Sequence, residues 1–235
     1  MNVQFADFLQ KLDWSPLFIS LKTGLAATVI CFFLGILVAG WIMARRKGTR
    51  AVIDSLLTLP LVIPPTASGF FLLLLFSKRR PLGMFLYDYF DIKIVQSWAG
   101  CVIAAVVIAF PLMYRNARAA FEQVDIDLIY AGRTLGLSDW KIFWRVVFPA
   151  ARPGIISGTV LTFARAMGEY GATSMLAGNI PGKTGTISQR IAMVIQNGDY
   201  LTAGFWVIVV MLIALVILMA INLFAGNTDK TAQRW

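Results

Sequence analysis

Five long runs of apolar residues constrain this chain more than any other feature of its sequence. Each run is close to or longer than about 20 residues, the helix length that crosses a hydrocarbon core of about 30 Å. Across the whole chain 58% of the residues are hydrophobic and 14% are charged, against about 25% charged in an ordinary soluble domain. The sequence therefore predicts an all-α protein that crosses a membrane several times.

We assign each apolar run to one spanning helix, with boundaries accurate to a few residues. The predicted spans are 18–43, 52–76, 97–115, 154–176 and 201–224. Before the first span, Phe5, Phe8, Leu9 and Leu12 recur at helical spacing among polar residues. We expect this segment to lie on the membrane surface.

The charged residues and cysteines exclude several classes of function. The chain carries 21 Lys and Arg against 12 Asp and Glu, and it has no His. The cations form short clusters between apolar runs, where they can orient a membrane protein, so nucleic-acid binding is the weaker interpretation. Cys31 and Cys101 fall inside apolar runs and are interpreted as small buried residues rather than a disulfide or metal site. We expect no metal, no cofactor and no catalytic residue.

The loop charges predict an orientation, because Lys and Arg are retained on the cytoplasmic side of a membrane. The clusters at 45–50, 115–152 and 230–234 lie on one side, which is therefore predicted to be cytoplasmic. With five spans the N-terminus then lies outside and the C-terminus inside. The cluster of Lys78, Arg79 and Arg80 falls on the outer side and argues against this assignment.

Residues 130–153 form a polar interruption on the predicted cytoplasmic side. Gly136 can end one helix in a left-handed conformation, while Ser138 and Asp139 offer an N-cap and a first-turn negative charge for the next. Pro149 and Pro153 are expected to end that second helix.

The second helix of this interruption carries an aromatic stripe. Trp140, Phe143, Trp144 and Val147 follow the spacing i, i+3, i+4, i+7, which places them on one helix face. Such a helix could dock in a groove of a cytoplasmic partner, or its tryptophans could lie at the level of the lipid headgroups. The pattern alone favours the two interpretations equally.

The interruption resembles the cytoplasmic loop of permeases from ABC importers. That loop has the pattern Glu-Ala-Ala, three residues, Gly, nine residues, Ile, one residue, Leu-Pro. Here Ala131, Gly136 and Pro149 match it, Val146 and Phe148 are apolar substitutes, and Tyr130 and Gly132 depart from it. Asp127, one turn earlier, is a candidate substitute for the missing Glu.

The resemblance covers about residues 21–224 and implies the fold of type I importer permeases over a single transmembrane domain, 1–235, with its core at 18–224. It implies that residues 137–147 form the coupling helix that inserts into a separate ATPase subunit. The residues assigned to coupling are Ala131, Gly136, Trp140, Phe143, Trp144 and Pro149.

A second segment, 168–186, is similar to the molybdate branch of these permeases, through GEYGAT and AGNIPGKT. Sulfate permeases share parts of the segment, and tungstate permeases have a related loop. Residues 177–184 also fit a relaxed phosphate-loop pattern, but they follow a predicted membrane helix and include Pro181, so we reject nucleotide binding. The external loop, 177–200, could instead meet an oxyanion or a binding protein through Asn179, Lys183 and Thr184, or be a simple turn. Within it, Ile187, Ile191, Val194 and Ile195 predict a short external helix beside polar Gln189, Arg190 and Gln196.

Two features fall inside the predicted spans. Arg165 and Glu169 stand four residues apart, so they share a helix face and can pair, either along a translocation path or as a structural ion pair. Pro60, Pro64 and Pro65 interrupt the second span, and a broken helix either lines a path or is kinked for packing. We take Pro64, Pro65, Arg165, Glu169, Asn179 and Lys183 as candidate pathway or gate residues.

The function expected from the sequence is that of a permease subunit importing a tetrahedral oxyanion, molybdate first and sulfate, thiosulfate or tungstate as alternatives. By resemblance, two copies form the pathway in the cytoplasmic membrane of a prokaryote, in contact with lipid. Two ATPase subunits and an external binding protein are the expected partners, and the chain itself hydrolyses nothing. A passive channel and an intramembrane enzyme are the alternatives from other classes, and both lack support in the motifs.

Overall fold

The computed structural model describes the backbone of residues 12–43 and 45–232 and the side chains up to residue 219. Phe5, Phe8, Leu9 and Arg234 lie outside the described residues. Every regular element in the described part of the chain is helical. In chain order the elements are α2 Ser15–Met43, α3 Lys47–Thr58, η1 Leu59–Leu61, α4 Pro65–Phe76, α5 Pro81–Phe90, α6 Trp98–Glu122, α7 Ile126–Thr134, α8 Asp139–Ile142, η2 Phe143–Val147, α9 Phe148–Met167, α10 Gly171–Ala177, α11 Ile187–Gln196 and α12 Tyr200–Ala232.

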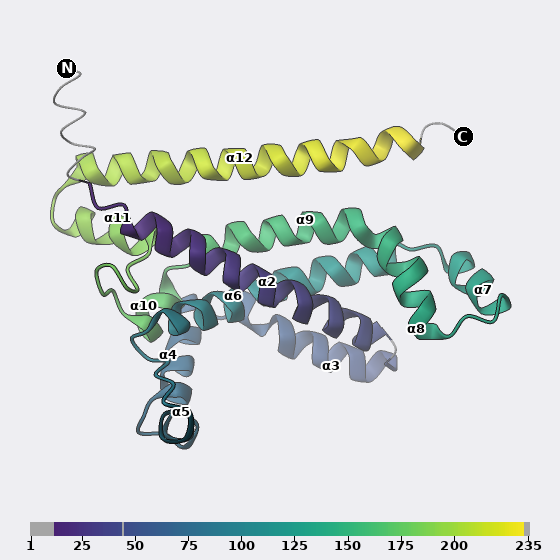
Figure 1. The fold of residues 1–235 in the computed structure, drawn as a ribbon, viewed down its shortest axis with the longest axis horizontal. Coiled ribbons are helices and arrows are strands. Elements are labelled where there is room, and N and C mark those ends of the chain that lie inside the picture. The colour runs from purple at the N-terminus through teal and green to yellow at the C-terminus, as the bar shows by residue number, and fades with distance from the viewer. Residues whose placement is uncertain (1–11, 44, 233–235) are drawn as a thin grey trace.

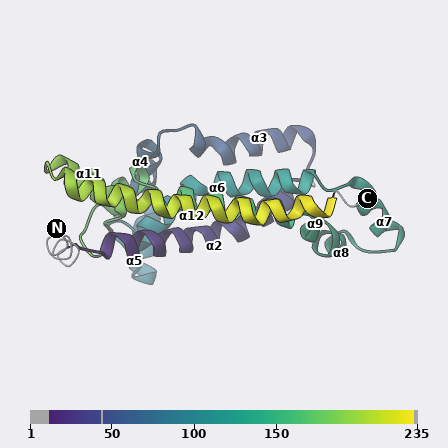
Figure 2. The same cartoon turned by 90° about the horizontal axis from the view of Figure 1, so that it is seen from above.

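Four helices are long and apolar enough to cross a membrane, which confirms the predicted fold class. They run Ser15–Met43, Trp98–Glu122, Asp139–Met167 and Tyr200–Met219, and a fifth span exists if the bent pair Lys47–Leu61 and Pro65–Phe76 crosses as one. α2, α6, α9 and α12 run in a common direction, and α8 bends away from the end of α9 (Figure 1). α12 lies along the outside of this bundle, and α3 lies at its edge beside α6 (Figure 2).

The predicted second span is two helices that meet at 103°. Pro64 precedes Pro65, the first residue of α4, and has ψ of 134°. A residue before proline is driven out of the helical region by the proline ring, so the chain must turn at this point. The break that the prolines predict within 52–76 is therefore confirmed.

The predicted fourth span, 154–176, is also wrong at both ends. Its helix begins at Asp139, continues through η2 and α9 to Met167, and gives way to α10 only after residues 168–170. Pro149 and Pro153 do not end it. The turn before Pro149 is π-helical, and the N–H of Phe148 donates to the carbonyl of Phe143, five residues back. This wider turn accommodates a proline ring without interrupting the helix.

Small residues bring the central helices α2, α6 and α9 together. A methyl group added to Gly35 of α2 would lie 2.8 Å from the side chain of Met113. One added to Gly158 of α9 would lie 2.6 Å from the Cβ of Asn116. Close backbone approach is the principal source of attraction between helices in lipid, where burial of apolar surface contributes little.

Both cysteines belong to this packing. Cys31 and Cys101 are fully buried and form no disulfide. The thiol of Cys31 donates to the carbonyl of Val106 at 3.6 Å, and that of Cys101 donates to the carbonyl of Thr184 at 3.7 Å. The interpretation of both as small buried residues is confirmed.

Candidate functional site

The turn between α7 and α8 is a Schellman motif centred on Gly136. The N–H of Gly136 donates to the carbonyl of Arg133 at 2.9 Å, and the N–H of Leu137 donates to that of Gly132 at 3.1 Å. Gly136 has φ of +74°, a conformation that other residues adopt at a cost. The predicted helix end at Gly136 is therefore confirmed, and it reverses the chain so that α8 returns beside α7.

Gly132 stands where the importer pattern has its second alanine, and it packs against Ile142 of α8. A methyl group there would be 3.0 Å from Cγ1 of Ile142, which is buried. Ala131 and Tyr130 face outward and are exposed. Asp127 lies in the first turn of α7 and is exposed. The missing glutamate position is thus occupied by an exposed tyrosine on the outer face of the loop.

The aromatic stripe is divided between the core and the surface. Trp140 is 67% exposed and Trp144 is 38% exposed, and their rings contact each other edge to face at 5.6 Å. Phe143 packs inward on Phe121 at 5.3 Å and beside Gly40, and Val147 is buried. The stripe therefore attaches α8 to α2 and α6 through one edge and presents two indole rings on the other.

An apolar cavity of about 680 Å³ separates the exposed part of α8 from α2. Its walls are Leu37, Val38, Gly40, Trp41, Asp139, Trp140 and Phe143. Ser138 occupies the N-cap position of α8 as predicted, but its hydroxyl makes no capping hydrogen bond, and the carboxylate of Asp139 accepts instead from Nε of Arg133 at 3.2 Å. α8 is thus held mainly at its C-terminal end, where Phe143 of η2 packs on Phe121.

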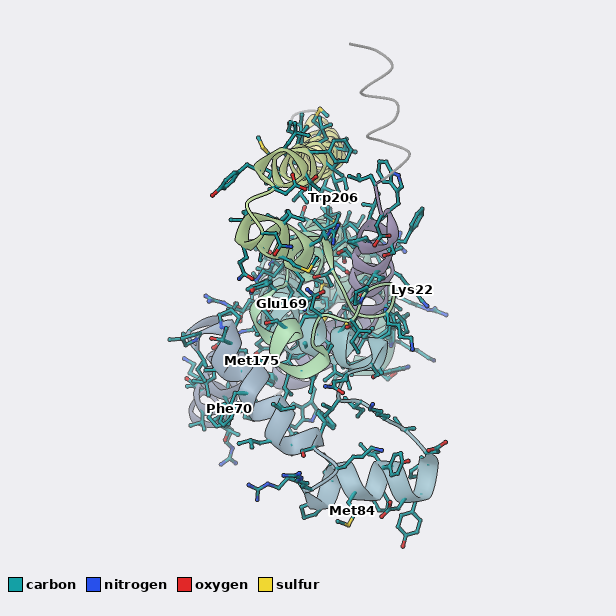
Figure 3. The ribbon with its side chains drawn as sticks, turned by 90° about the vertical axis from the view of Figure 1, so that its left-hand side faces the viewer. Lys22, Phe70, Met84, Glu169, Met175 and Trp206 are labelled. Carbon is teal, nitrogen blue, oxygen red and sulfur yellow. The ribbon has the colours of Figure 1, made fainter. Side chains whose placement is uncertain are left out.

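A second group of candidate residues lies where the two broken segments of the chain meet. α4, which begins at Pro65, packs on α10, which begins at Gly171. A methyl group added to Gly69 would lie 2.6 Å from Cα of Ala172, and one added to Gly171 would lie 3.0 Å from Cβ of Pro65. In a view along the bundle, Glu169 lies between the helices, while Phe70 and Met175 mark α4 and α10 (Figure 3).

Arg165 and Glu169 pair, although not on one helix. α9 ends at Met167, so Glu169 lies in the link to α10. Its carboxylate, 2% exposed, accepts from Nη1 of Arg165 at 2.8 Å and from the N–H of Ala172 at 2.8 Å. Arg165 is 35% exposed. Because both oxygens of the buried carboxylate are used, the pair fixes the angle between α9 and α10.

The loop that follows α10 turns two polar side chains, Thr184 and Gln189, inward. Gly178 has φ of +67° and ψ of −166°, a region that only glycine adopts readily. Its carbonyl accepts from the Thr184 hydroxyl at 3.3 Å and from Nε2 of Gln189 at 2.9 Å. The N–H groups of Lys183 and Thr184 donate to the Ile180 carbonyl. Of the predicted contact residues, Asn179 and Lys183 are exposed, and Thr184 is fully buried.

The phosphate-loop pattern at 177–184 lies in a helical context, since α10 precedes it and α11 follows. α11 confirms the predicted short helix, and Ile187 and Val194 are buried on it. Gln189, which lies beside the predicted apolar stripe, is buried and accepts from the Thr186 N–H at 2.9 Å. The N–H of Ile187 donates to the Ser20 hydroxyl of α2 at 2.8 Å, so the loop is tied to the bundle.

One polar cluster has almost no signal in the sequence. Asp54 of α3 contacts both Tyr114 and Arg118 of α6, and Glu122 pairs with Arg118 and with Arg50. α3 has no fully buried residue of its own, and this cluster joins it to α6 in addition to the packing of the partly buried Ile53 and Leu57 on the core. The only sequence signals are a carboxylate inside a predicted span and the spacing of Arg118 and Glu122.

Comparison with known proteins places this geometry in a family. Residues 23–230 match the family described as binding-protein-dependent transport system inner membrane component. The molybdenum transport system permease protein of Escherichia coli strain K12 is 44% identical over 79% of this chain and 81% of its own length. The sulfate transport system permease protein of the same organism is 34% identical over 85% of this chain and 73% of its own.

The fold also matches solved structures. A chain of a bacterial ABC transporter involved in the import of alginate superposes with a TM-score of 0.74 at 17% identity, covering 95% of this chain and 83% of that one. At this identity the match concerns the fold alone. Since the family match covers most of the chain, the protein belongs to the family of binding-protein-dependent transport system inner membrane components.

Proposed function

We propose that this chain is the permease subunit of an ABC importer for molybdate. It is a transport subunit, and ATP is hydrolysed by a separate ATPase. The observation that carries the coupling part of this proposal is the pair of exposed indole rings, Trp140 and Trp144, on a helix at the end of the bundle. A solvated helix end gains nothing by exposing two large apolar rings unless a partner covers them.

The covalent path from this surface into the membrane suggests how coupling works. α8 continues through η2 into α9 without a break, so Asp139–Met167 is one helix. Movement of Trp140 and Phe143 by an ATPase subunit would therefore be carried along this helix to Arg165 at its far end. The assigned residues are Ala131 and Gly136, which shape the loop, Trp140, Phe143 and Trp144, which form the contact, and Pro149 at the π-helical turn.

The proposed pathway lies where α4 packs on α10. Pro64 and Pro65 interrupt one segment, the Arg165–Glu169 pair holds the break in the other, and Asn179 and Lys183 face outward above them. Interrupted helices with ionisable residues are tolerated in a membrane where they line a cavity. Two copies of the chain would enclose this path within the lipid. The N-terminus would lie outside and the C-terminus in the cytoplasm, and an external binding protein would deliver the anion.

The substrate assignment is supported by the 44% identity to the molybdenum permease, with sulfate as the second candidate through the sulfate permease at 34%. Both anions are doubly charged tetrahedra. Segment 168–186 contributes Lys183 as its one exposed cation among the described side chains, which suits either anion. Selectivity is therefore assigned mainly to the binding protein.

The proposal is tested by reconstituting the chain with its ATPase in vesicles and measuring ATP hydrolysis with the external binding protein and one anion at a time. We expect molybdate to stimulate hydrolysis only when the binding protein is present. Stimulation by sulfate and not molybdate would transfer the assignment to sulfate. If the chain bound no ATPase and no anion changed hydrolysis, the importer proposal would fail.

A further inference from the structure

A cluster of four cations lies at the end of the bundle opposite α8. Lys78, Arg79 and Arg80 connect α4 to α5, and Lys93 follows α5. All four are exposed. None forms an ion pair with a carboxylate of the described chain, in contrast to Arg165. Asp88 and Asp91 on the same segment lie unpaired with them. The cluster is also the one that opposes the charge-based orientation, so its cations require another explanation.

Three of these cations line a hollow that is attached to the bundle. Lys78, Arg79 and Lys93 line a cavity of about 450 Å³, together with Ser77 and Gln96. The backbone N–H of Gln96 donates to the Leu176 carbonyl of α10 at 3.1 Å, which ties the cavity wall to the bundle. The ammonium of Lys78 lies 3.0 Å from the centre of the Tyr87 ring, so α5 orients it.

The helix beside this hollow has an apolar face that nothing in the described chain covers. Phe85 is 49% exposed, Tyr89 is 76% exposed and Phe90 is 60% exposed, and Phe85 contacts both other rings at 5.0 and 5.8 Å. α5 runs across the direction of the spanning helices, so Figure 1 shows it end-on. In Figure 3 it lies at the periphery, with Met84 outermost among the labelled residues.

A short helix that crosses the bundle direction, with aromatic rings on one side and cations beside it, has the chemistry of the interface between lipid tails and headgroups. Aromatic side chains prefer this depth, and Lys and Arg attract anionic headgroups. We propose that α5 lies in the membrane interface, and that Lys78, Arg79 and Lys93 hold the phosphate of an anionic phospholipid in the hollow between α4 and α5, with Arg80 next to them in the chain.

A protein partner is the other class of occupant for an exposed aromatic face. The cations and the rings belong to one continuous segment of a chain whose spanning helices are themselves surrounded by lipid. An occupant that satisfies both features carries an anionic group within reach of Lys78 and an apolar part within reach of Phe85. A phospholipid offers both in one molecule.

The test places a fluorophore on α5 and asks which lipids lie next to it. Tyr89→Cys can be labelled selectively, because Cys31 and Cys101 are fully buried. The full chain is placed in nanodiscs that contain nitroxide-labelled phosphatidylglycerol or, at equal content, nitroxide-labelled phosphatidylcholine. We expect the anionic lipid to quench the fluorophore about twofold more strongly, or better, through enrichment at the cations.

Two charge variants separate this site from a general effect of charge. Replacing Lys78, Arg79 and Arg80 together by Gln should abolish the difference between the two lipids. The matched control replaces Arg45, Arg46 and Lys47, a cluster at the other end of the bundle, and should preserve the difference. Gel filtration checks that both variants remain folded.

Three results would overturn the proposal. One is equal quenching by both lipids in the unmodified chain. Another is a fluorophore that no lipid quenches and that only the external binding protein shields, which would make α5 a protein-docking surface. The third is loss of the difference on adding inorganic phosphate or molybdate, but not chloride at the same ionic strength, which would assign the hollow to a free anion. The test is independent of the transported substrate.

Discussion

The two loops at opposite ends of the bundle each turn at a glycine, but their side chains point in opposite directions, outward in one loop and inward in the other. The loop from α7 to α8 turns at Gly136 and presents Trp140 and Trp144 to the outside. The loop after α10 turns at Gly178 and directs Thr184 and Gln189 inward, where both donate to the Gly178 carbonyl. One loop leaves apolar surface uncovered, and the other is held by hydrogen bonds from Thr184 and Gln189 to its own backbone.

This difference predicts different effects of substitution in the two loops. A loop that is stabilised by its own hydrogen bonds loses stability when a bond is removed. A loop that exposes apolar rings loses little stability when a ring is removed, but loses affinity for whatever covers the ring. Stability and assembly should therefore respond to substitutions in opposite regions of the molecule.

The largest loss of stability is expected at Glu169, which lies in the link between α9 and α10 and leads to the loop that turns at Gly178. Glu169→Ala would leave the Ala172 N–H and Arg165 without their partner, and we expect a loss of about 3 kcal/mol in the free energy of unfolding. Glu169→Gln keeps one acceptor oxygen and should cost about 1 kcal/mol. Unfolding in mixed micelles measures both. Asp139→Ala, in the exposed ion pair with Arg133, is the control, at no more than about 1 kcal/mol.

The two turn glycines should differ although neither has an atom within 4 Å of an added methyl group. Gly178→Ala places alanine in a region that only glycine adopts readily, at about 2 to 3 kcal/mol. Gly136→Ala places it in the left-handed helical region, at about 1 kcal/mol. Equal losses in unfolding experiments would show that the two loops are equally strained and would remove this part of the comparison.

A smaller loss is expected at Gln189. Gln189→Ala removes the acceptor of the Thr186 N–H and the donor to the Gly178 carbonyl, at about 1 to 2 kcal/mol. Ile195→Ala on the exposed side of the same helix is the control and should cost under about 0.5 kcal/mol. If the two variants unfolded at the same denaturant concentration, the inward hydrogen bonds would not be what holds the loop.

The smallest effect on stability is expected at Trp140. Because this ring is 67% exposed, Trp140→Ala should change the free energy of unfolding by no more than about 0.5 kcal/mol. Phe143→Ala is the internal comparison, since that ring packs on Phe121, and it should cost about 2 to 3 kcal/mol. Thermal unfolding of the two variants shows whether the stripe is divided between surface and core as described.

The sequence predicts those parts of the fold that depend on local composition. The length of the apolar runs is sufficient to predict α2, α6 and α12, and Gly136 is sufficient to predict the helix end before α8. The prediction is wrong at Pro149, because one π-helical turn removes the clash that a proline makes in an ordinary helix. The break at residues 168–170 contains Gly168 and Glu169, but the prediction placed one span across it. The Ala172 N–H holds it by donating to the Glu169 carboxylate.

The candidate site residues also divide into those that local spacing predicts and those that depend on tertiary contacts. The spacing of Trp140 and Trp144 is sufficient to place them on one face, since that face is a local property of a helix. The contact of Asp54 with Tyr114 and Arg118 is not predictable from spacing, because these partners lie 60 and 64 residues after Asp54 in the chain. The packing of α4 on α10 at Gly69 is likewise a tertiary contact with no local signal.

The measurement that tests the central claim most directly is the assembly of Trp140→Asp with the ATPase subunit. The matched control is Tyr200→Asp, a ring 72% exposed at the opposite end of the bundle. We expect Trp140→Asp to remain folded, to lose co-purification with the ATPase by about tenfold or more, and to lose transport, while Tyr200→Asp keeps both. Assembly and transport that survive Trp140→Asp unchanged would contradict the assignment of α8 as the coupling surface.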